Sequence, residues 1–212
     1  CDRMEDIIGD VDAVLLARDD AENHVAMSKP FLEAGIPIFI DKPLAISLKD
    51  AEEMFTLQKY DYQIFSCSSL RFAEELTLSA EDQLALGRCT FIEARIPKKW
   101  ETYAVHLIDP IIYNTPERGL LRKVEKTIHG DAHKALITWT PLKAEIGVYK
   151  DFPGGIEFYY YGTQGMIKKV FSDSFQAFKS SIVVFIEGIK SKNIIIKREE
   201  TLEIVKILEL GI

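Results

Sequence analysis

The 212-residue sequence lacks several features that would place it in a simple class. It has no apolar run of membrane-spanning length, so we expect a soluble protein. It has no Lys/Arg-dense block, and its formal net charge is −7 at pH 7, which argues against a nucleic-acid partner. The three cysteines (Cys1, Cys67 and Cys89) are far apart and odd in number. They predict neither a disulfide framework nor a zinc site, and they suit a reducing cytoplasm.

The sequence also lacks an initiating methionine, because it begins with Cys1. A mature lipoprotein would begin with an acylated cysteine followed by a flexible polar tether, whereas here residues 2–10 lead directly into a strand-like segment. We therefore expect the sequence to be a piece of a longer chain whose amino-terminal part is missing. Enough is present for a real core, because 47% of the residues are hydrophobic.

Strands and helices alternate over residues 1–68. The predicted strands are Val11 to Ala17, Ile36 to Ile40 and Tyr62 to Cys67. The predicted helices run from a cap at Asp19-Asp20 through Glu33, with Gly35 as the stop, and from Ser47, where Ser47 and Asp50 form a capping-box pattern. Alternation over short loops predicts a doubly wound parallel sheet.

The pattern changes near residues 67–72, where we place a domain border and expect domains at 1–68 and 69–212. Arg71 to Leu86 is predicted to be helical, ending at Gly87, with a strand at Cys89 to Ile96 and a helix at Val105 to Tyr113. Period-two patterning from Val124 to Phe171 predicts an open, mainly antiparallel sheet with hairpins. Two amphipathic helices, at Phe175 to Ile189 and Glu199 to Leu210, close the chain and could pack back on the first domain.

The segment Ile38-Phe39-Ile40-Asp41-Lys42-Pro43 ends a predicted buried strand in two charges and a proline. Ligands bind at the carboxyl edge of open α/β sheets, and Pro43 restricts the backbone of Lys42. Lys42 is therefore a candidate ligand-facing cation, the alternative being a solvated lysine at a strand end.

His106 and Asp109 are spaced i, i+3, so both could face one cleft from the predicted helix. Histidine suits a general base for an alcohol proton, although a core histidine satisfied by Asp109 is the alternative. A second histidine pattern, His129-x-Asp131-x-His133, contains a predicted turn at Gly130-Asp131 that breaks the strand register, so we predict no metal site.

Taken in order, several segments resemble the Gfo/Idh/MocA oxidoreductases, the family typified by glucose–fructose oxidoreductase and inositol dehydrogenase. The stretch VDAVLLARDDAENHVAMSKPFLEAGIPIFIDKPLA is similar to the second half of the family's Rossmann domain, including its acid-lysine-proline signature. Further likeness lies in Ser69-Leu70-Arg71-Phe72, Val105-His106-Leu107-Ile108-Asp109, Tyr161-Gly162-Thr163-Gln164-Gly165 and the last two helices.

The resemblance implies a partial Rossmann domain followed by a substrate and oligomerisation domain, with NAD or NADP as cofactor and a sugar or cyclitol-like substrate. It implies that Lys42 and His106 handle the proton. The implied cofactor contacts are Ala17, Arg18, Asp19, His24, Asp41, Lys42 and Pro43; for His24, a helix-start histidine is an equal alternative. The implied substrate contacts are Asp109, Thr102, Trp100, Tyr103 and Arg71, with a structural role favoured for Arg71. A homodimer or tetramer would cover the open sheet, on which we expect aromatic residues such as Phe158 and Tyr160 to be exposed.

The sequence departs from the family pattern at two places. It contains no G-x-G-x-x-G fingerprint, so we expect this chain alone to bind a dinucleotide poorly. Thr102 and Ala104 stand where the family has an acid and a glycine before the histidine. These departures leave two alternatives open: a non-catalytic paralogue that binds a sugar or a protein, and a lyase or glycosidase that retains NAD.

Overall fold

The computed structural model describes residues 3–212, so Cys1, one of the three cysteines, lies outside the described residues. Cys67 and Cys89 are free thiols. The chain divides into two compact units. Unit 1 comprises Cys1–Ser68 and Ile182–Lys206, and unit 2 comprises Ser69–Ser181 and Ile207–Ile212. Among the residues described, no helix combines the length and the apolarity that crossing a membrane requires.

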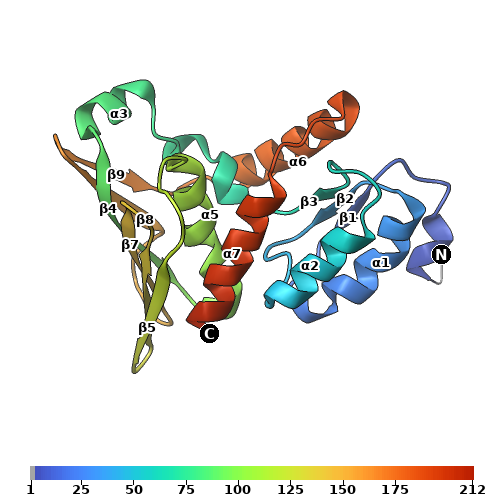
Figure 1. The fold of residues 1–212 in the computed structure, drawn as a ribbon, viewed down its shortest axis with the longest axis horizontal. Coiled ribbons are helices and arrows are strands. Elements are labelled where there is room, and N and C mark those ends of the chain that lie inside the picture. The colour runs from blue at the N-terminus through green and yellow to red at the C-terminus, as the bar shows by residue number, and fades with distance from the viewer. Residues whose placement is uncertain (1–2) are drawn as a thin grey trace. The chain divides into compact units, whose positions relative to one another are not determined.

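Unit 1 contains a three-stranded parallel sheet in the order β1-β2-β3 (Figure 1). The strands are shorter than predicted, with β1 at Val14–Leu16, β2 at Ile38–Ile40 and β3 at Ile64–Phe65. All three residues of the central strand β2 are buried, as expected for an apolar run in a parallel sheet. The prediction of a parallel sheet in this region is confirmed.

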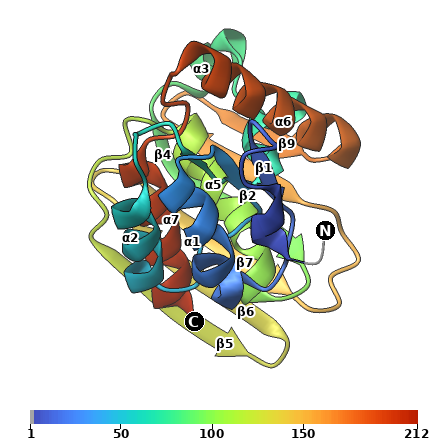
Figure 2. The same cartoon turned by 90° about the vertical axis from the view of Figure 1, so that its right-hand side faces the viewer.

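The helices α1 (His24–Ala34) and α2 (Leu48–Leu57) of unit 1 lie side by side (Figure 2). Gly35 ends α1 in the left-handed conformation, with a φ of 76°, and the Ser47 hydroxyl caps α2 by accepting a hydrogen bond from the Asp50 amide at 3.1 Å. Both ends match the prediction. A 3-10 turn, η1 (Met4–Ile7), precedes β1.

The start of α1 differs from the prediction. A 3-10 turn, η2 (Ala21–Asn23), comes first, and the Asp20 carboxylate forms no capping bond to the backbone. It accepts hydrogen bonds from the side chains of Arg18 and Asn23 instead. Because the side chain is occupied by these partners, the regular helix begins only at His24.

The core of unit 1 lies around its sheet and includes buried side chains from α1, α2 and the last helix, among them Phe31, Met54 and Val205. The helices α6 (Ser174–Ser191) and α7 (Arg198–Gly211) contribute their segments within 182–206 to this unit. The Phe185 ring of α6 packs 5.7 Å from the ring of Phe39 and 5.5 Å from that of Phe65.

Unit 2 is built on a six-stranded sheet in the order β5-β6-β7-β4-β8-β9. The strands are β4 (Cys89–Pro97), β5 (Lys123–His129), β6 (Ala132–Thr138), β7 (Lys143–Tyr149), β8 (Glu157–Gly162) and β9 (Met166–Val170). The pair β4 and β7 is parallel and all other neighbours are antiparallel. The predicted fold class, a parallel Rossmann-like sheet followed by a mainly antiparallel one, is confirmed.

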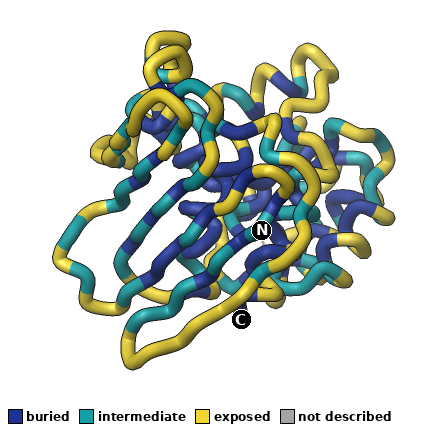
Figure 3. The backbone as a smooth tube through the Cα atoms, turned by 60° about the vertical axis from the view of Figure 1, so that its left-hand side comes forward, coloured by how far each residue is buried: buried dark blue, intermediate teal, exposed yellow. Residues whose placement is uncertain are grey.

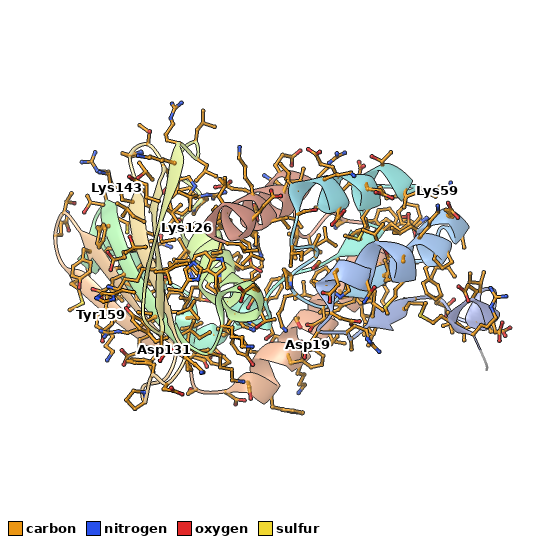
Figure 4. The ribbon with its side chains drawn as sticks, turned by 90° about the horizontal axis from the view of Figure 1, so that it is seen from below. Asp19, Lys59, Lys126, Asp131, Lys143 and Tyr159 are labelled. Carbon is orange, nitrogen blue, oxygen red and sulfur yellow. The ribbon has the colours of Figure 1, made fainter. Side chains whose placement is uncertain are left out.

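Burial alternates along β4 and β8, two neighbouring strands of this sheet (Figure 3). The expectation that Phe158 and Tyr160 are exposed is wrong, because both are fully buried. Successive side chains of a strand point to opposite faces, so their neighbour Tyr159 projects from the other, open face (Figure 4). The pattern of alternation was visible in the sequence, but the choice of the covered face was not.

The helices of unit 2 begin differently from the prediction of one helix over residues 71–86. The chain forms two 3-10 turns, η3 (Ser69–Phe72) and η4 (Glu74–Leu76), and then the short helix α3 (Ala80–Leu86). A capping box between Ser79 and Asp82 starts α3, and Gly87 ends it. The helices α4 (Trp100–Tyr103) and α5 (Val105–Asn114) follow β4, and α5 lies along one face of the sheet (Figure 1).

Candidate functional site

In unit 1, the segments that follow β1 and β2 meet at the carboxyl edge of the parallel sheet. Leu16 is paired with Ile40, and the Asp41 amide donates to the Leu16 carbonyl at 2.9 Å, so the two chain segments leave the sheet together. One segment carries Ala17, Arg18 and Asp19, and the other carries Asp41, Lys42 and Pro43. Sequence reasoning placed all six residues at this edge, and the structure brings the two segments together.

Lys42 is held between two carboxylates at this edge. Its Nζ lies 3.0 Å from Asp19 Oδ1 and 3.2 Å from Asp41 Oδ2. Burial by itself lowers the pKa of Lys42, but the hydrogen bond to Asp19 and the charge of Asp41 outweigh it, so the pKa is raised above its ordinary value. The two carboxylates therefore keep Lys42 a charged hydrogen-bond donor.

The Arg18 side chain bonds the carboxylate of Asp20. Its Nε and Nη2 atoms each donate to the Asp20 carboxylate at 2.8 Å, a bidentate arrangement. The hydrogen bond from Arg18 is the main cause that holds the pKa of Asp20 well below its ordinary value. The Arg18 side chain is therefore bonded within its own loop, and its contact with a cofactor stays a prediction.

His24 is completely buried at the start of α1. Its Nδ1 lies 3.0 Å from the carbonyl oxygen of Leu44, and its Nε2 lies 3.0 Å from that of Arg18. A neutral imidazole can donate to only one of these oxygens, whereas a protonated ring donates to both. Sequence reasoning named His24 as a cofactor contact; the geometry favours a contact with the protein's own backbone.

In unit 2, the predicted residues gather at α5. The His106 side chain is half-buried, while Asp109, one turn further on, is fully buried. The Asp109 carboxylate accepts a hydrogen bond from Arg71 Nη1 at 2.6 Å, and the Arg71 guanidinium lies 5.0 Å from the centre of the Tyr113 ring. Burial of both partners favours a structural role for this ion pair. The substrate contact of Asp109 stays a prediction.

Trp100 also has a structural environment. It is buried, its indole N–H donates to the Leu208 carbonyl at 3.0 Å, and its ring stacks on His133 at a centroid distance of 4.5 Å. The N–H and one ring face of Trp100 thus already have protein partners, and its contact with a substrate stays a prediction. His133 in turn bonds the Gly211 carbonyl through Nε2.

No cluster of three or more potential metal ligands occurs among residues 3–212. The turn at Gly130 and Asp131 is present, and it places His129 and His133 on different strands. The H-x-D-x-H pattern therefore does not form a common face.

Tyr103 and Thr102 are both half-buried on α4, and the Tyr103 ring lies 5.5 Å from the His106 ring. Sequence reasoning missed their neighbour Lys98, whose Nζ donates to the Tyr103 hydroxyl and lies 4.4 Å from the centre of that ring. Lys98 has a φ of 90°, which an L-residue rarely adopts, and its amide donates to the Tyr149 carbonyl at 2.9 Å. No local signal in the sequence indicates such a backbone conformation at a lysine.

Two pockets are lined by residues other than the predicted ones. A pocket of about 390 Å³ in unit 2 is lined by residues that include Arg88, Cys89, Asn114 and Arg118. An open, mainly apolar concavity of about 440 Å³ in unit 1 lies along β1 and η1.

Comparison with solved structures shows which known fold the chain has. The chain has the two-domain fold of several dehydrogenases. It matches scyllo-inositol dehydrogenase from Lactobacillus casei, solved with NAD(H) and scyllo-inositol, with a TM-score of 0.75 and 19% identity over 97% of this chain and 79% of that one. An oxidoreductase from Thermotoga maritima gives a TM-score of 0.80 and 14% identity over 100% and 79%. GenD2 from gentamicin A biosynthesis, solved with NAD, gives 0.77 and 14% over 99% and 78%.

A family model matches the first part of the sequence. Residues 1–68 match the Gfo/Idh/MocA family, described as an oxidoreductase family with an NAD-binding Rossmann fold. The resemblance predicted from the sequence is therefore confirmed. The comparison with curated protein sequences gives no significant match.

Proposed function

We propose that the protein is an NAD-dependent oxidoreductase acting on a hydroxyl group of a sugar, a cyclitol or a related compound. The observation that carries the proposal is the position of Lys42. It projects from the carboxyl edge of a parallel sheet, where such sheets bind ligands, within the segment that matches an NAD-binding family. The likeness to dehydrogenases solved with NAD(H) and with NAD supports the same cofactor.

The described residues fit one end of such a cofactor. The side chains of Asp19 and Lys42 and the backbone of residues 17–19 and 41–43 lie at the open edge of the sheet. These residues would hold the cofactor there, and the bound cofactor supplies the acceptor for a hydride. No G-x-G-x-x-G loop occurs in the sequence, so the pyrophosphate has no such loop within residues 1–212.

In the proposed mechanism, Lys42 and His106 act on the substrate oxygen. The Lys42 ammonium, kept charged by Asp19 and Asp41, donates a hydrogen bond to this oxygen and stabilises negative charge on it. His106 accepts the hydroxyl proton as a general base. The proton thus leaves on an imidazole, and the C–H hydrogen leaves as hydride.

We further propose that residues 1–68 form part of the cofactor domain and residues 69–212 the substrate and oligomerisation domain of a cytoplasmic homodimer or tetramer. The open face of the unit 2 sheet, which carries Tyr159 and the half-exposed Tyr161, supplies the surface for self-association. Sedimentation of the full-length protein tests this assembly.

The mechanism is tested by turnover of the full-length protein with NAD and a panel of sugars and cyclitols. We expect Lys42→Ala and His106→Ala each to lower kcat about 10²- to 10⁴-fold, the usual contribution of a positioned proton-transfer group. Lys49→Ala, an exposed lysine on α2, is the matched control and should leave turnover unchanged. Unchanged turnover in Lys42→Ala would exclude the mechanism.

Thr102 supports a second candidate, a non-catalytic paralogue that binds a sugar or a protein. A threonine cannot act as a carboxylate base or orient His106 as an anion would. Calorimetry with NAD and with NADP on the full-length protein separates the two functions. Binding of neither nucleotide would favour the paralogue over the oxidoreductase.

A further inference from the structure

The attraction between the charges of Lys42 and Asp19 is too weak to fix the position of the Lys42 amine. The Lys42 side chain is 15% exposed, but that of Asp19 is 84% exposed. Ion pairs that face water contribute little to stability, because solvent screens them and two mobile side chains must be ordered. The two loops that carry this pair must therefore be fixed by other contacts if the amine is to keep one position.

His24 supplies such contacts from inside unit 1. Its Nε2 lies against the carbonyl of Arg18, the residue just before Asp19, and its Nδ1 lies against the carbonyl of Leu44, two residues after Lys42. The protonated ring donates to both carbonyls, and each neutral tautomer donates to one of them. Both contacts measure 3.0 Å, and the ring is completely buried. One rigid side chain thus spans the loop after β1 and the loop after β2.

Burial gives these contacts weight. The contact with Leu44 is buried and that with Arg18 is partly buried. A buried carbonyl that loses its donor is destabilised more than an exposed ion pair stabilises. The imidazole is anchored by the first turn of α1, and its plane has little freedom, since two oxygens on opposite sides determine its orientation. The loops are therefore fixed relative to each other by the histidine more than by the ion pair.

We propose that His24 is a positioning residue for Lys42: it ties the backbone beside Asp19 to the backbone beside Lys42 and so holds the amine at the edge of the sheet. The catalytic importance of this arrangement rests on the proposed function, whereas the geometric part does not. His24 touches neither substrate nor cofactor in this role, and it acts only through the two loops.

The test measures the chemical reactivity of Lys42, which needs no cofactor or substrate. An amine reagent attacks only the neutral amine, so its rate at Lys42, followed by peptide mass spectrometry, reports how firmly the two carboxylates hold the ammonium. We expect His24→Phe, which fills the same space without a donor, to raise the Lys42 rate about two- to fivefold. Lys59, an exposed lysine in the same unit, is the internal control and should keep its rate (Figure 4).

His24→Gln keeps a side-chain donor, so its Lys42 rate should lie between those of the wild type and of His24→Phe. Asp19→Asn removes the carboxylate directly and should raise the Lys42 rate even though His24 is unchanged. If His24 acts through the pair, adding His24→Gln to Asp19→Asn changes the Lys42 rate no further, which a double-mutant comparison measures.

A merely structural histidine would give a different result. His24→Phe and His24→Gln would then lower the melting temperature while the rate at Lys42 stayed equal to wild type, and the proposal would be overturned. If His24→Phe fails to fold, the comparison of His24→Gln with Asp19→Asn and the double variant decides alone. If Lys42→Ala leaves turnover unchanged but His24→Phe still raises the Lys42 rate, the proposed reaction is rejected and the positioning role of His24 is kept.

Discussion

The Lys42–Asp19 pair of unit 1 and the Arg71–Asp109 pair of unit 2 are both close contacts between a cation and a carboxylate, at 3.0 and 2.6 Å. Their surroundings are opposite. Asp19 is 84% exposed, whereas Arg71 and Asp109 are 4% and 0% exposed. The first pair lies at the edge of a sheet with its carboxylate in water, while the second is enclosed and joins η3 to α5. Similar contact distances therefore occur in opposite environments, and the two pairs should differ in their contribution to stability.

The largest expected effect comes from breaking the buried pair. Arg71→Met leaves the Asp109 carboxylate buried without its guanidinium partner, so we expect the free energy of unfolding to fall by about 3–5 kcal/mol. Denaturant titration measures this change. The double variant Arg71→Met/Asp109→Leu removes both charges and should recover most of the loss. A loss below about 1 kcal/mol in the single variant would mean that the pair behaves like an exposed one.

A smaller effect, of opposite sign, is expected at Lys98. Glycine adopts the φ of 90° without steric cost, so Lys98→Gly should raise the free energy of unfolding by about 1 kcal/mol. Lys98→Ala is the matched control, because it loses the same contact to Tyr103 but keeps the strained backbone. Equal stability of the two variants would show that the backbone conformation stores no strain.

The smallest effect is expected at the exposed pair. Asp19→Asn should lower the free energy of unfolding by less than about 1 kcal/mol, and added salt should shrink the difference. Because the pKa of Lys42 is raised on folding, its contribution is fully present below the ordinary value of 10.5 and is lost as the pH rises through the higher folded value. Denaturation between neutral and strongly alkaline pH should therefore show the Asp19→Asn difference vanishing at the alkaline end. If the Asp19→Asn variant is still less stable than the wild type at alkaline pH, the difference does not come from the charge of Lys42.

Much of the fold could be predicted because local signals coincided with it. Gly35 and the Ser47 cap set helix ends, and the apolar run of β2 indicated a buried parallel strand. The prediction failed where a stronger local signal was overlooked, since the Ser79–Asp82 capping box marks the true start of α3. It also failed at Phe158, because the face of a sheet that helices cover is decided by tertiary packing.

The candidate site was predictable only in outline. Parallel strand ends share an edge, so the neighbourhood of Asp19 and Lys42 followed from topology. The bonds of His24 to two carbonyls depend on loop conformation, and the Arg71–Asp109 pair joins residues 38 positions apart. Neither arrangement leaves a periodic or spaced signal in the sequence.

The two tryptophans of the chain, Trp100 and Trp139, are both buried and both belong to unit 2. Intrinsic fluorescence therefore senses the melting of one half of the molecule, while far-ultraviolet dichroism senses both halves. If the two optical signals give different midpoints, the two units unfold independently. The unfolding of unit 1, which carries Lys42, can then be followed without adding a dye.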